Sequence, residues 1–588
     1  MNAQGHRFAM HARRALAAAA VVVFALAGAA LAAEPAANAG SDQARFEALI
    51  RRSVAEHFAF EPSFATFMGV HDHDAELEDY SKAAIDRHVA ALRASLADLK
   101  KIDPAKLSPE SRIDYAFFQR STEGQIFRWA ELRGWEKDPT QYGFAWGIDN
   151  LIARPFAPPE ERLKSVVARL EQVPRQFENA RKNLVNPPPL FTQFAAGDLE
   201  GSIEYLDTDV TRAFADVKDP ALLAKFDAAK KTAEDATRAY VKWLRDDLLP
   251  RSKGTYVLGE ANFRKRLHDE EMIDEPIDTL LAIGSREMAR LDARFHAAAE
   301  RIAPGAPLDS VLAMMRADHP TKDGLLGEVR TLLDSLRDYV VASRFIDLPS
   351  GVPLRVRPTP EFEASRSFAS FDGPGPFETK ARDAYYNVTL PAADWDSAHV
   401  EQHLQGYSRW TLPSVSIHEC YPGHYVHFLF SPKAPTYARK NLYASSFGEG
   451  WGLYVEQAMF DHGYAKDDPK KELGMLRWAL VRSCRLQVGI RVHTRGMTMD
   501  EATQYFVDHA YMERPNAERE AYRAAFDPTY VVYTIGALQI RKLRDDLAKE
   551  EGASFDLATF HDRILSEGAL PVVLLRRMLL KHDEGSSL

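Results

Sequence analysis

The segment from His418 to His424 has the sequence His-Glu-Cys-Tyr-Pro-Gly-His, whose residue types are those of a zinc-dependent hydrolase. In the common form of such a site, two histidines four residues apart on one helix bind zinc. The glutamate that follows the first histidine acts as general base. Here Pro422 stands four residues after His418, and the second histidine arrives two residues later. The chemistry therefore depends on whether the chain can bring the two histidines together.

Helix geometry indicates that the segment cannot be one continuous helix and still form a site. Positions six apart lie about 120° apart around an α-helix, so an unbroken helix would direct His418 and His424 away from each other. Pro422 cannot donate a hydrogen bond to the carbonyl of His418, and its ring clashes there. Gly423 tolerates almost any backbone conformation. A break at Pro422 and Gly423 would permit His424 to return to the side of His418.

A third ligand candidate lies in the segment Phe447–Glu456, where Glu449 and Glu456 are seven residues apart and share one face of a helix. Two histidines and one glutamate form a familiar catalytic zinc set with one open position. We therefore expect His418, His424 and Glu449 to bind one Zn²⁺ ion. Glu419 would accept a proton from the water that the metal activates, and Glu456 is expected to orient a ligand histidine.

One alternative ligand set remains open from the sequence. His424 and His427 are three residues apart, a helical spacing that could itself chelate a metal together with a carboxylate.

Several segments resemble one bacterial family, the domain of unknown function 885 family. The matching patterns are His-Glu-x-x-Pro-Gly-His, Glu-Gly-Trp-x-x-Tyr-x-Glu, the Pro-Gly segment Ser370–Phe377 with Tyr385–Val388 after it, Arg491-Val492-His493 and Tyr533–Gly536. In the third of these segments the family commonly has Gly-Ile-His, so the histidine matches and the glycine does not. His427 stands where the family commonly has glutamine. The resemblance covers most of the chain.

That family is placed with the gluzincin metallopeptidases, relatives of thimet-type oligopeptidases and angiotensin-converting enzyme. The resemblance implies a mainly α, two-lobed helical fold with a small β-sheet beside the active-site cleft. It also implies that a strand just before the zinc helix lines the cleft and pairs with extended substrate. The spacing from His424 to Glu449 is close to that of the relatives, which favours His424 as the second histidine ligand.

The relatives also place tyrosine and histidine donors downstream of the zinc site, where they stabilise an oxyanion. This implies catalytic roles for Tyr533 and His493, with Tyr530 as a competitor of Tyr533. Arg485 and Arg491 could bind a substrate carboxylate, although arginines at such positions more often form structural ion pairs.

The elements that must position these residues are mostly helices. Apolar residues recur about every 3.6 positions over Ser81–Lys101, Ser108–Ala130, Pro159–Leu184, Asp219–Leu249, Ile277–Ile302 and Gly324–Val341. Ser108-Pro109 and Asp219-Pro220 are helix start signals. Ala384–Leu390 is typical of a strand. We expect an N-terminal helical lobe over 42–345 and a catalytic region with a short sheet and zinc-binding helices over 346–588.

The N-terminus has the pattern of a cleavable signal peptide. Basic residues up to Arg14 precede the apolar stretch Ala15–Ala29 and the small-residue site Ala30-Leu31-Ala32. This predicts a signal peptide at 1–33, a linker at 34–41 and export, to the periplasm in a Gram-negative host. No later segment is apolar enough to predict a membrane span.

Composition excludes several classes of protein. The formal net charge is −10, from 74 basic and 84 acidic residues, and no basic patch indicates a nucleic-acid partner. Two cysteines, Cys420 and Cys484, are too few for a disulfide scaffold. Cys420 is expected to be a buried small residue. The oligomeric state is not indicated.

The leading hypothesis is an exported zinc metallopeptidase that hydrolyses oligopeptides, with carboxypeptidase and dipeptidase specificities among the options. Two alternatives come from other classes: a zinc hydrolase of non-peptide amides or esters, and a periplasmic binding or scaffold protein with an inactive site. The joint presence of His418, Glu419, His424 and Glu449 argues against the last, because drift would remove at least one of them.

Overall fold

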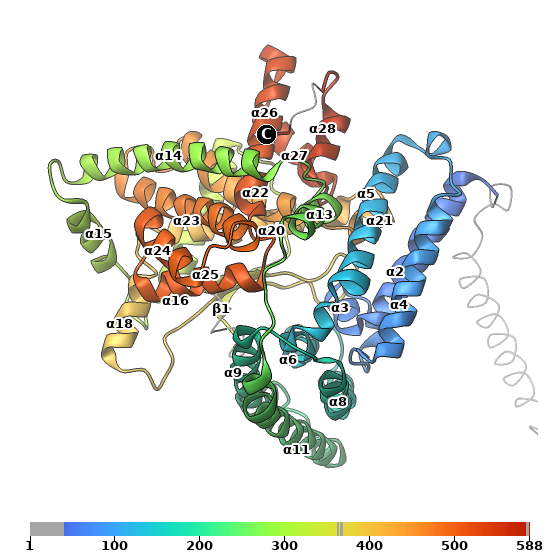
Figure 1. Cartoon of the computed structure of the whole chain (residues 1–588). Helices are drawn as coiled ribbons and strands as arrows, with labels where there is room; N and C mark the ends of the chain where they lie inside the picture. The colour runs from blue at the N-terminus through green and yellow to red at the C-terminus, as the bar shows by residue number, and fades with distance from the viewer. Residues whose placement is uncertain (1–39, 361–363, 365–367, 584–586) are drawn as a thin grey trace, which may run out of the picture.

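The computed structural model describes residues 40–360, 364, 368–583 and 587–588. The predicted signal peptide (1–33) and most of the predicted linker (34–41) lie outside the described residues. The described chain is mainly helical, and its strands form one three-stranded sheet (Figure 1). Within this part of the chain, no helix is both long and apolar enough to cross a lipid bilayer.

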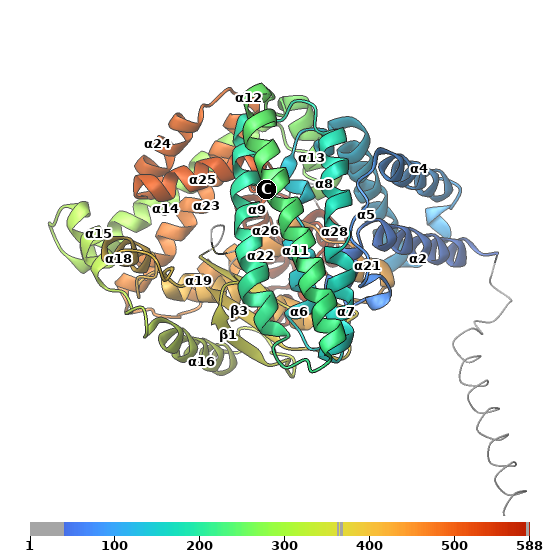
Figure 2. The ribbon, with the colours of Figure 1, turned by 90° about the horizontal axis from the view of Figure 1, so that it is seen from below.

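The N-terminal helices form the lower and right-hand parts of Figure 1. They are α2 (Asp42–Phe60), α3 (Pro62–Phe67), α4 (Lys82–Leu99), α5 (Pro109–Ile126), α6 (Ala145–Ile152), α7 (Pro159–Leu170), α8 (Val173–Asn183), α9 (Pro189–Tyr205), α10 (Thr211–Ala213), α11 (Pro220–Trp243) and α12 (Leu249–Arg251). Figure 2 shows α9 and α11 side by side, with α8 and α7 one after the other along α11. Their apolar faces share one buried cluster.

The remaining elements contain the candidate site. They are α13 (Glu260–Glu271), α14 (Ile277–Ile302), α15 (Leu308–Ala317), α16 (Leu325–Ser343), β1 (Leu354–Pro358), β2 (Ala369–Asp372), β3 (Ala384–Val388), α18 (Ser397–Gln405), α19 (Leu412–Glu419), α20 (His424–Phe430), α21 (Tyr437–Asn441), α22 (Ser445–Asp461), α23 (Pro469–Thr494), α24 (Met499–Ala510), α25 (Arg514–Phe526), α26 (Val532–Glu551), α27 (Leu557–Ser566) and α28 (Val572–Leu579).

The predicted helix starts agree with the structure. Ser108 caps α5 by accepting a hydrogen bond from the backbone N–H of Ser111, and Asp219 caps α11 in the same way. The helix predicted over 159–184 is divided, because α8 begins with Pro174 in its first turn. A proline inside a continuous helix would remove a hydrogen bond and clash with the preceding turn.

The packing of the core differs from the predicted lobe boundary at residue 345. Leu280, Leu291 and Phe295 of α14 belong to the same buried cluster as Leu480 and Ile490 of α23, and α14 lies along α23 (Figure 1). Helices α13 to α16 thus share a core with the catalytic region. An amphipathic pattern indicates that a helix buries one face, but it does not indicate which other element packs against that face.

The strand predicted near residue 384 is confirmed as β3, although its place in the sheet was not foreseen. The strand order is β1-β3-β2, with β1 parallel and β2 antiparallel to β3. Because β3 has neighbours on both sides, it has no free edge for a peptide. The strand that lies against α19 is β2, an edge strand.

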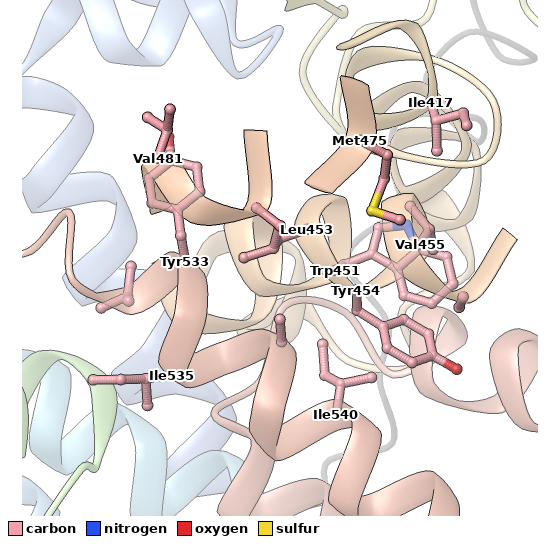
Figure 3. Close-up of a cluster of buried hydrophobic side chains, with 14 of the residues drawn as sticks. Ile417, Trp451, Leu453, Tyr454, Val455, Met475, Val481, Tyr533, Ile535 and Ile540 are labelled. Atoms are coloured by element: carbon pink, nitrogen blue, oxygen red, sulfur yellow. The ribbon is translucent and has the colours of Figure 1, made fainter. Parts of the chain in front are cut away.

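The C-terminal core surrounds α22 and α26, which cross closely. A Cβ on Gly450 of α22 would lie 2.6 Å from Gly536 of α26, so neither helix tolerates a side chain there. Figure 3 shows the buried cluster beside this crossing, with side chains from α19 (Ile417), α22 (Trp451, Leu453, Tyr454, Val455), α23 (Met475, Val481) and α26 (Tyr533, Ile535, Ile540). This packing fixes the helices that carry the candidate site.

Candidate metal centre

The break predicted at Pro422 and Gly423 separates α19 from α20. α19 ends at Glu419 and α20 begins at His424. The N–H of Gly423 donates to the carbonyl of Ile417 at 2.9 Å, which turns the chain back on α19. A Cβ on Gly423 would lie 1.8 Å from the carbonyl oxygen of His418, so the turn requires glycine.

Trp451 holds this break from the side of α22. Its indole Nε1 donates to the carbonyl of Pro422 at 3.0 Å and lies 3.3 Å from that of Gly423. The side chain is fully buried and belongs to the core. The break also brings the imidazoles of His418 and His424 together, with ring centres 4.7 Å apart and planes 86° apart.

Glu449 of α22 completes a three-residue cluster. Its Oε2 atom lies 3.4 Å from Nε2 of His418 and 3.4 Å from Nε2 of His424. Among the described residues, these three form the one group whose donor atoms could hold a metal ion, all within 4.8 Å of one another. The expected ligand set is therefore assembled by the fold.

The distances from Oε2 of Glu449 to the two histidine nitrogens suit a tetrahedral metal ion. Ligand bonds of about 2.1 Å at tetrahedral angles separate neighbouring ligand atoms by about 3.4 Å. In the described part of the chain, the Glu449 Oε2 atom is buried and has no hydrogen-bond partner of ordinary geometry. A buried oxygen of this kind is costly unless a cation satisfies it.

The electrostatics of the cluster keep the carboxylate ionised. Burial opposes ionisation of Glu449, but the imidazoles of His418 and His424 hold the pKa of its carboxyl well below the usual range. Burial likewise opposes protonation of His418. The carboxylates of Glu449 and Glu456 outweigh that effect and raise the pKa of His418 to about 9. Without a metal, a proton on His418 therefore balances the charge of the neighbouring carboxylates. A metal ion that binds here would displace that proton.

Glu456 orients His418, as expected. Its Oε1 atom lies 2.8 Å from Nδ1 of His418, which leaves Nε2 facing Glu449. The carboxylate of Glu456 is itself fixed by the hydroxyl of Ser414 and by Arg482, whose Nη2 lies 3.5 Å away. A carboxylate that holds the outer nitrogen of a histidine is the usual support of a metal-binding imidazole.

Glu419, the candidate general base, is held by the sheet. Its Oε2 atom accepts a hydrogen bond of 2.9 Å from the backbone N–H of Phe371 in β2. The bond occupies one carboxylate oxygen and leaves Oε1 for a second partner. Strand β2 therefore positions the residue next to His418 on α19.

Tyr533 lies beside the cluster on α26. Its ring is nearly parallel to that of His418, at 18°, with ring centres 6.1 Å apart. Its Oη atom accepts a hydrogen bond of 3.1 Å from Nη2 of Arg523. Burial raises the pKa of Tyr533 to about 12, so its hydroxyl keeps its proton and can donate it.

The structure does not bring His493 to the cluster. Its Nε2–H donates to the carbonyl of Ala524 at 2.8 Å, and its Nδ1 atom faces the N–H of Leu258 at 3.4 Å. The side chain is fully buried, and burial lowers its pKa to about 4. With both ring nitrogens committed to backbone groups, His493 connects α23 to two neighbouring segments and has no proton left for an oxyanion.

His427 and Tyr530 also lie outside the cluster as the structure describes it. His427 packs against the ring of Phe447 at 5.4 Å, and burial lowers its pKa to about 3. The alternative ligand set with His427 is therefore not assembled. The Tyr530 hydroxyl is buried and has no hydrogen-bond partner in the described residues.

Cys420 and Cys484 are both buried and free, which confirms the expectation for Cys420. Burial raises the pKa of each thiol well above its usual value. Neither thiol is thus available as a nucleophile at neutral pH.

Three supporting residues were not identified from the sequence. Ser414 and Arg482 hold Glu456, and Glu271 of α13 accepts hydrogen bonds from the N–H groups of Ser445 and Ser446 at the start of α22. Ser414 is four residues before His418, a spacing that could have indicated a shared helix face. Nothing in the sequence connects Glu271 or Arg482 to the site.

The fold and the cluster define a mainly helical protein with a candidate His-His-Glu metal centre. The chain belongs to the family described as "Bacterial protein of unknown function (DUF885)", whose model matches residues 62–579. No curated protein matches the chain.

Two solved structures share the fold. A protein of Shewanella oneidensis, provisionally described as a lipoprotein of unknown function, is 26% identical; the match has a TM-score of 0.75 and covers 91% of this chain and 100% of that one. A protein of Colwellia psychrerythraea, provisionally described as a lipoprotein, is 16% identical, with a TM-score of 0.77 and coverage of 92% and 98%.

Proposed function

We propose that this protein is an exported zinc-dependent peptidase that hydrolyses oligopeptides. The observation that carries the proposal is the meeting of His418, His424 and Glu449, in which each histidine Nε2 lies 3.4 Å from Oε2 of Glu449. Glu419 is adjacent to His418 on α19. The provisional description of two structural neighbours as lipoproteins supports a location in the cell envelope.

Zinc is the cation that best fits the donor set. Calcium and magnesium prefer cages of oxygen ligands, whereas two imidazoles and one carboxylate are typical of catalytic zinc. His418, His424 and Glu449 would hold the ion, which when bound supplies Lewis acidity that activates water and polarises a carbonyl.

Glu419 would act as the general base. Phe371 holds Oε2, so the free Oε1 atom would take the proton of the attacking water and later deliver it to the leaving amine. A carboxylate accepts hydrogen bonds at both oxygens, so Glu419 can take this role while Oε2 stays bound to Phe371.

Tyr533 would stabilise the developing oxyanion. Its oxygen accepts from Arg523, so its own O–H proton is free to be donated. Donors fixed in advance at the place where negative charge develops are often a large part of an enzyme's rate enhancement.

The test combines metal content, a peptide library and the variant Glu419→Gln. Elemental analysis of the protein purified with zinc present should give one zinc per chain. The library should be cleaved, and Glu419→Gln should keep the zinc and lose roughly 10²- to 10⁴-fold in rate. Glu200→Gln, at an exposed carboxylate paired with Arg245 on the surface, serves as control and should retain full activity.

Each negative result has a distinct meaning. Zinc without peptide cleavage would favour a hydrolase of non-peptide amides or esters. Failure to bind zinc when zinc is in excess would contradict both the peptidase and the amide or ester hydrolase hypotheses. It would favour a binding or scaffold role.

A further inference from the structure

A partly exposed cation lies directly beside the candidate site. Arg523 of α25 keeps 40% of its side chain exposed, and its Nη2 atom contacts Oη of Tyr533 at 3.1 Å and Oδ2 of Asp527 at 3.4 Å. In the described part of the chain, its Nε and Nη1 atoms have no hydrogen-bond partner. A guanidinium therefore presents unused donors to solvent.

The other arginines near this position are already paired. Arg485 makes two hydrogen bonds of 2.7 Å with Glu520, and its side chain is 6% exposed. Arg482 is equally buried against Glu456. Each of these guanidinium groups pairs with a buried carboxylate. If either bound a ligand instead, its carboxylate would be left buried and unpaired. Arg523 differs because its ion pair with Asp527 is long and exposed, and such pairs contribute little.

Tyr533 connects Arg523 to the metal-binding cluster. The guanidinium carbon of Arg523 lies 5.7 Å from the centre of the Tyr533 ring, and that centre lies 6.1 Å from the ring centre of His418. One extended peptide residue spans about 3.4 Å. A negative group one to three residues beyond the bond to be cleaved is therefore within reach of Arg523.

We propose that Arg523 binds the terminal carboxylate of the peptide substrate, so that the enzyme removes short pieces from the C-terminus of oligopeptides. The proposal rests on the proposed peptidase function and names its substrate class. A guanidinium with free N–H donors forms strong, charge-assisted hydrogen bonds with a carboxylate.

The decisive experiment compares two peptide libraries that differ only at the C-terminus. One library has acetylated N-termini and free terminal carboxylates, and the other has the same sequences as C-terminal amides, some containing an internal glutamate. The wild-type zinc enzyme should cleave the acids roughly 10- to 100-fold faster in kcat/KM than the amides. Mass spectrometry should place the cut one to three residues from the C-terminus.

The variant Arg523→Gln should abolish this preference by raising KM for the acids much more than for the amides, and Arg523→Lys should restore part of it. Any slowing through Tyr533 should affect kcat for acids and amides alike. Arg514→Gln is the control, because Arg514 lies on the same helix and its partners are Glu518 and Gln504. If Arg523 only orients Tyr533, Arg523→Gln will slow acids and amides equally, and that outcome overturns the proposal. Equal cleavage of acids and amides by the wild type, or cleavage guided by the internal glutamate, also overturns it.

A binding measurement separates this proposal from the peptidase function. Calorimetry with an acetylated dipeptide and with its amide, on the zinc-loaded Glu419→Gln protein, needs no turnover. Tighter binding of the acid that is lost on adding Arg523→Gln supports the carboxylate site even if no peptide is hydrolysed. Equal binding of acid and amide, or binding of neither, contradicts it.

Discussion

Nδ1 of His418 lies 2.8 Å from Oε1 of Glu456, and this contact joins two helices through buried side chains. The residues are 38 positions apart in the sequence. The bond fixes the orientation of the imidazole and directs Nε2 at Glu449 before any metal arrives. Glu456 is therefore a positioning residue, and its contribution should be visible in metal affinity.

We predict that Glu456→Gln lowers zinc affinity by roughly 10- to 100-fold, because the neutral amide holds and polarises the imidazole less strongly. Competition with a chromogenic chelator measures the affinity directly. Glu472→Gln, which removes a carboxylate paired with Arg294 and Arg301 on α14, is the control and should leave the affinity unchanged. Equal affinities for Glu456→Gln and wild type would show that the bond does not support a metal ligand.

Zinc binding should depend on pH in a direction set by His418. The neighbouring carboxylates overcome the effect of burial and raise its pKa to about 9, so the metal-free site holds a proton at neutral pH. Zinc requires the neutral imidazole. The apparent affinity should therefore rise about tenfold per pH unit from pH 7 to pH 9 and level off above. Calorimetry at pH 7.5 in buffers of different ionisation enthalpy should detect proton release, and its absence would contradict the assignment.

Gly452→Ala should disrupt the site without touching a ligand. A Cβ at this position would lie 2.5 Å from Cε1 and 2.7 Å from Nδ1 of His418, so the ring would have to leave Glu456. We expect at least a tenfold loss of zinc affinity. Gly201→Ala in α9, with no atom within 4 Å of the added Cβ, should keep the affinity and raise stability by about 0.4–1 kcal/mol. Zinc titration and thermal unfolding of both variants test this pair.

We predict that titration of Glu271 makes the free energy of unfolding fall as the pH rises. Its buried carboxylate accepts from Ser445 and Ser446 at the start of α22, and burial raises its pKa to about 7 from the ordinary 4.5. Between these two values the folded state binds more protons than the unfolded state, so the free energy of unfolding decreases from about pH 4.5 to pH 7. Glu271→Gln should flatten this part of the curve.

Thermal unfolding between pH 4.5 and 8 measures the effect, with Glu260→Gln as control because that exposed carboxylate lies on the same helix and pairs with Arg495. Parallel curves for Glu271→Gln and wild type would show that Glu271 does not titrate in this window.

Local physical chemistry explains why much of the site was predictable from the sequence. A proline and a glycine between His418 and His424 end a helix by steric and hydrogen-bonding rules that hold in any fold. The pairing of Glu449 and Glu456 follows from helix periodicity alone. The start signals at Ser108 and Asp219 are likewise satisfied within one turn.

The tertiary structure decided which candidates meet. His427 and His493 have suitable chemistry, but the first packs against Phe447 and the second binds the backbone of Ala524. The place of β2 beside Glu419 depends on the strand order of the sheet, which strand propensity does not encode.

Arg523 and Arg485 show most clearly that the sequence does not reveal which side chains the fold buries. Both are arginines on helices, and the sequence led us to name Arg485, not Arg523, as a candidate for binding a substrate carboxylate. Packing buries Arg485 against Glu520, whereas it leaves Arg523 partly in solvent beside Tyr533. The sequence by itself indicated the candidate ligands and the break between His418 and His424, because residue type, spacing and helix breaking depend on neighbours along the chain. The sheet register, the contacts of the supporting carboxylates and the partial exposure of Arg523 were decided only by the fold. They depend on contacts between residues far apart in sequence.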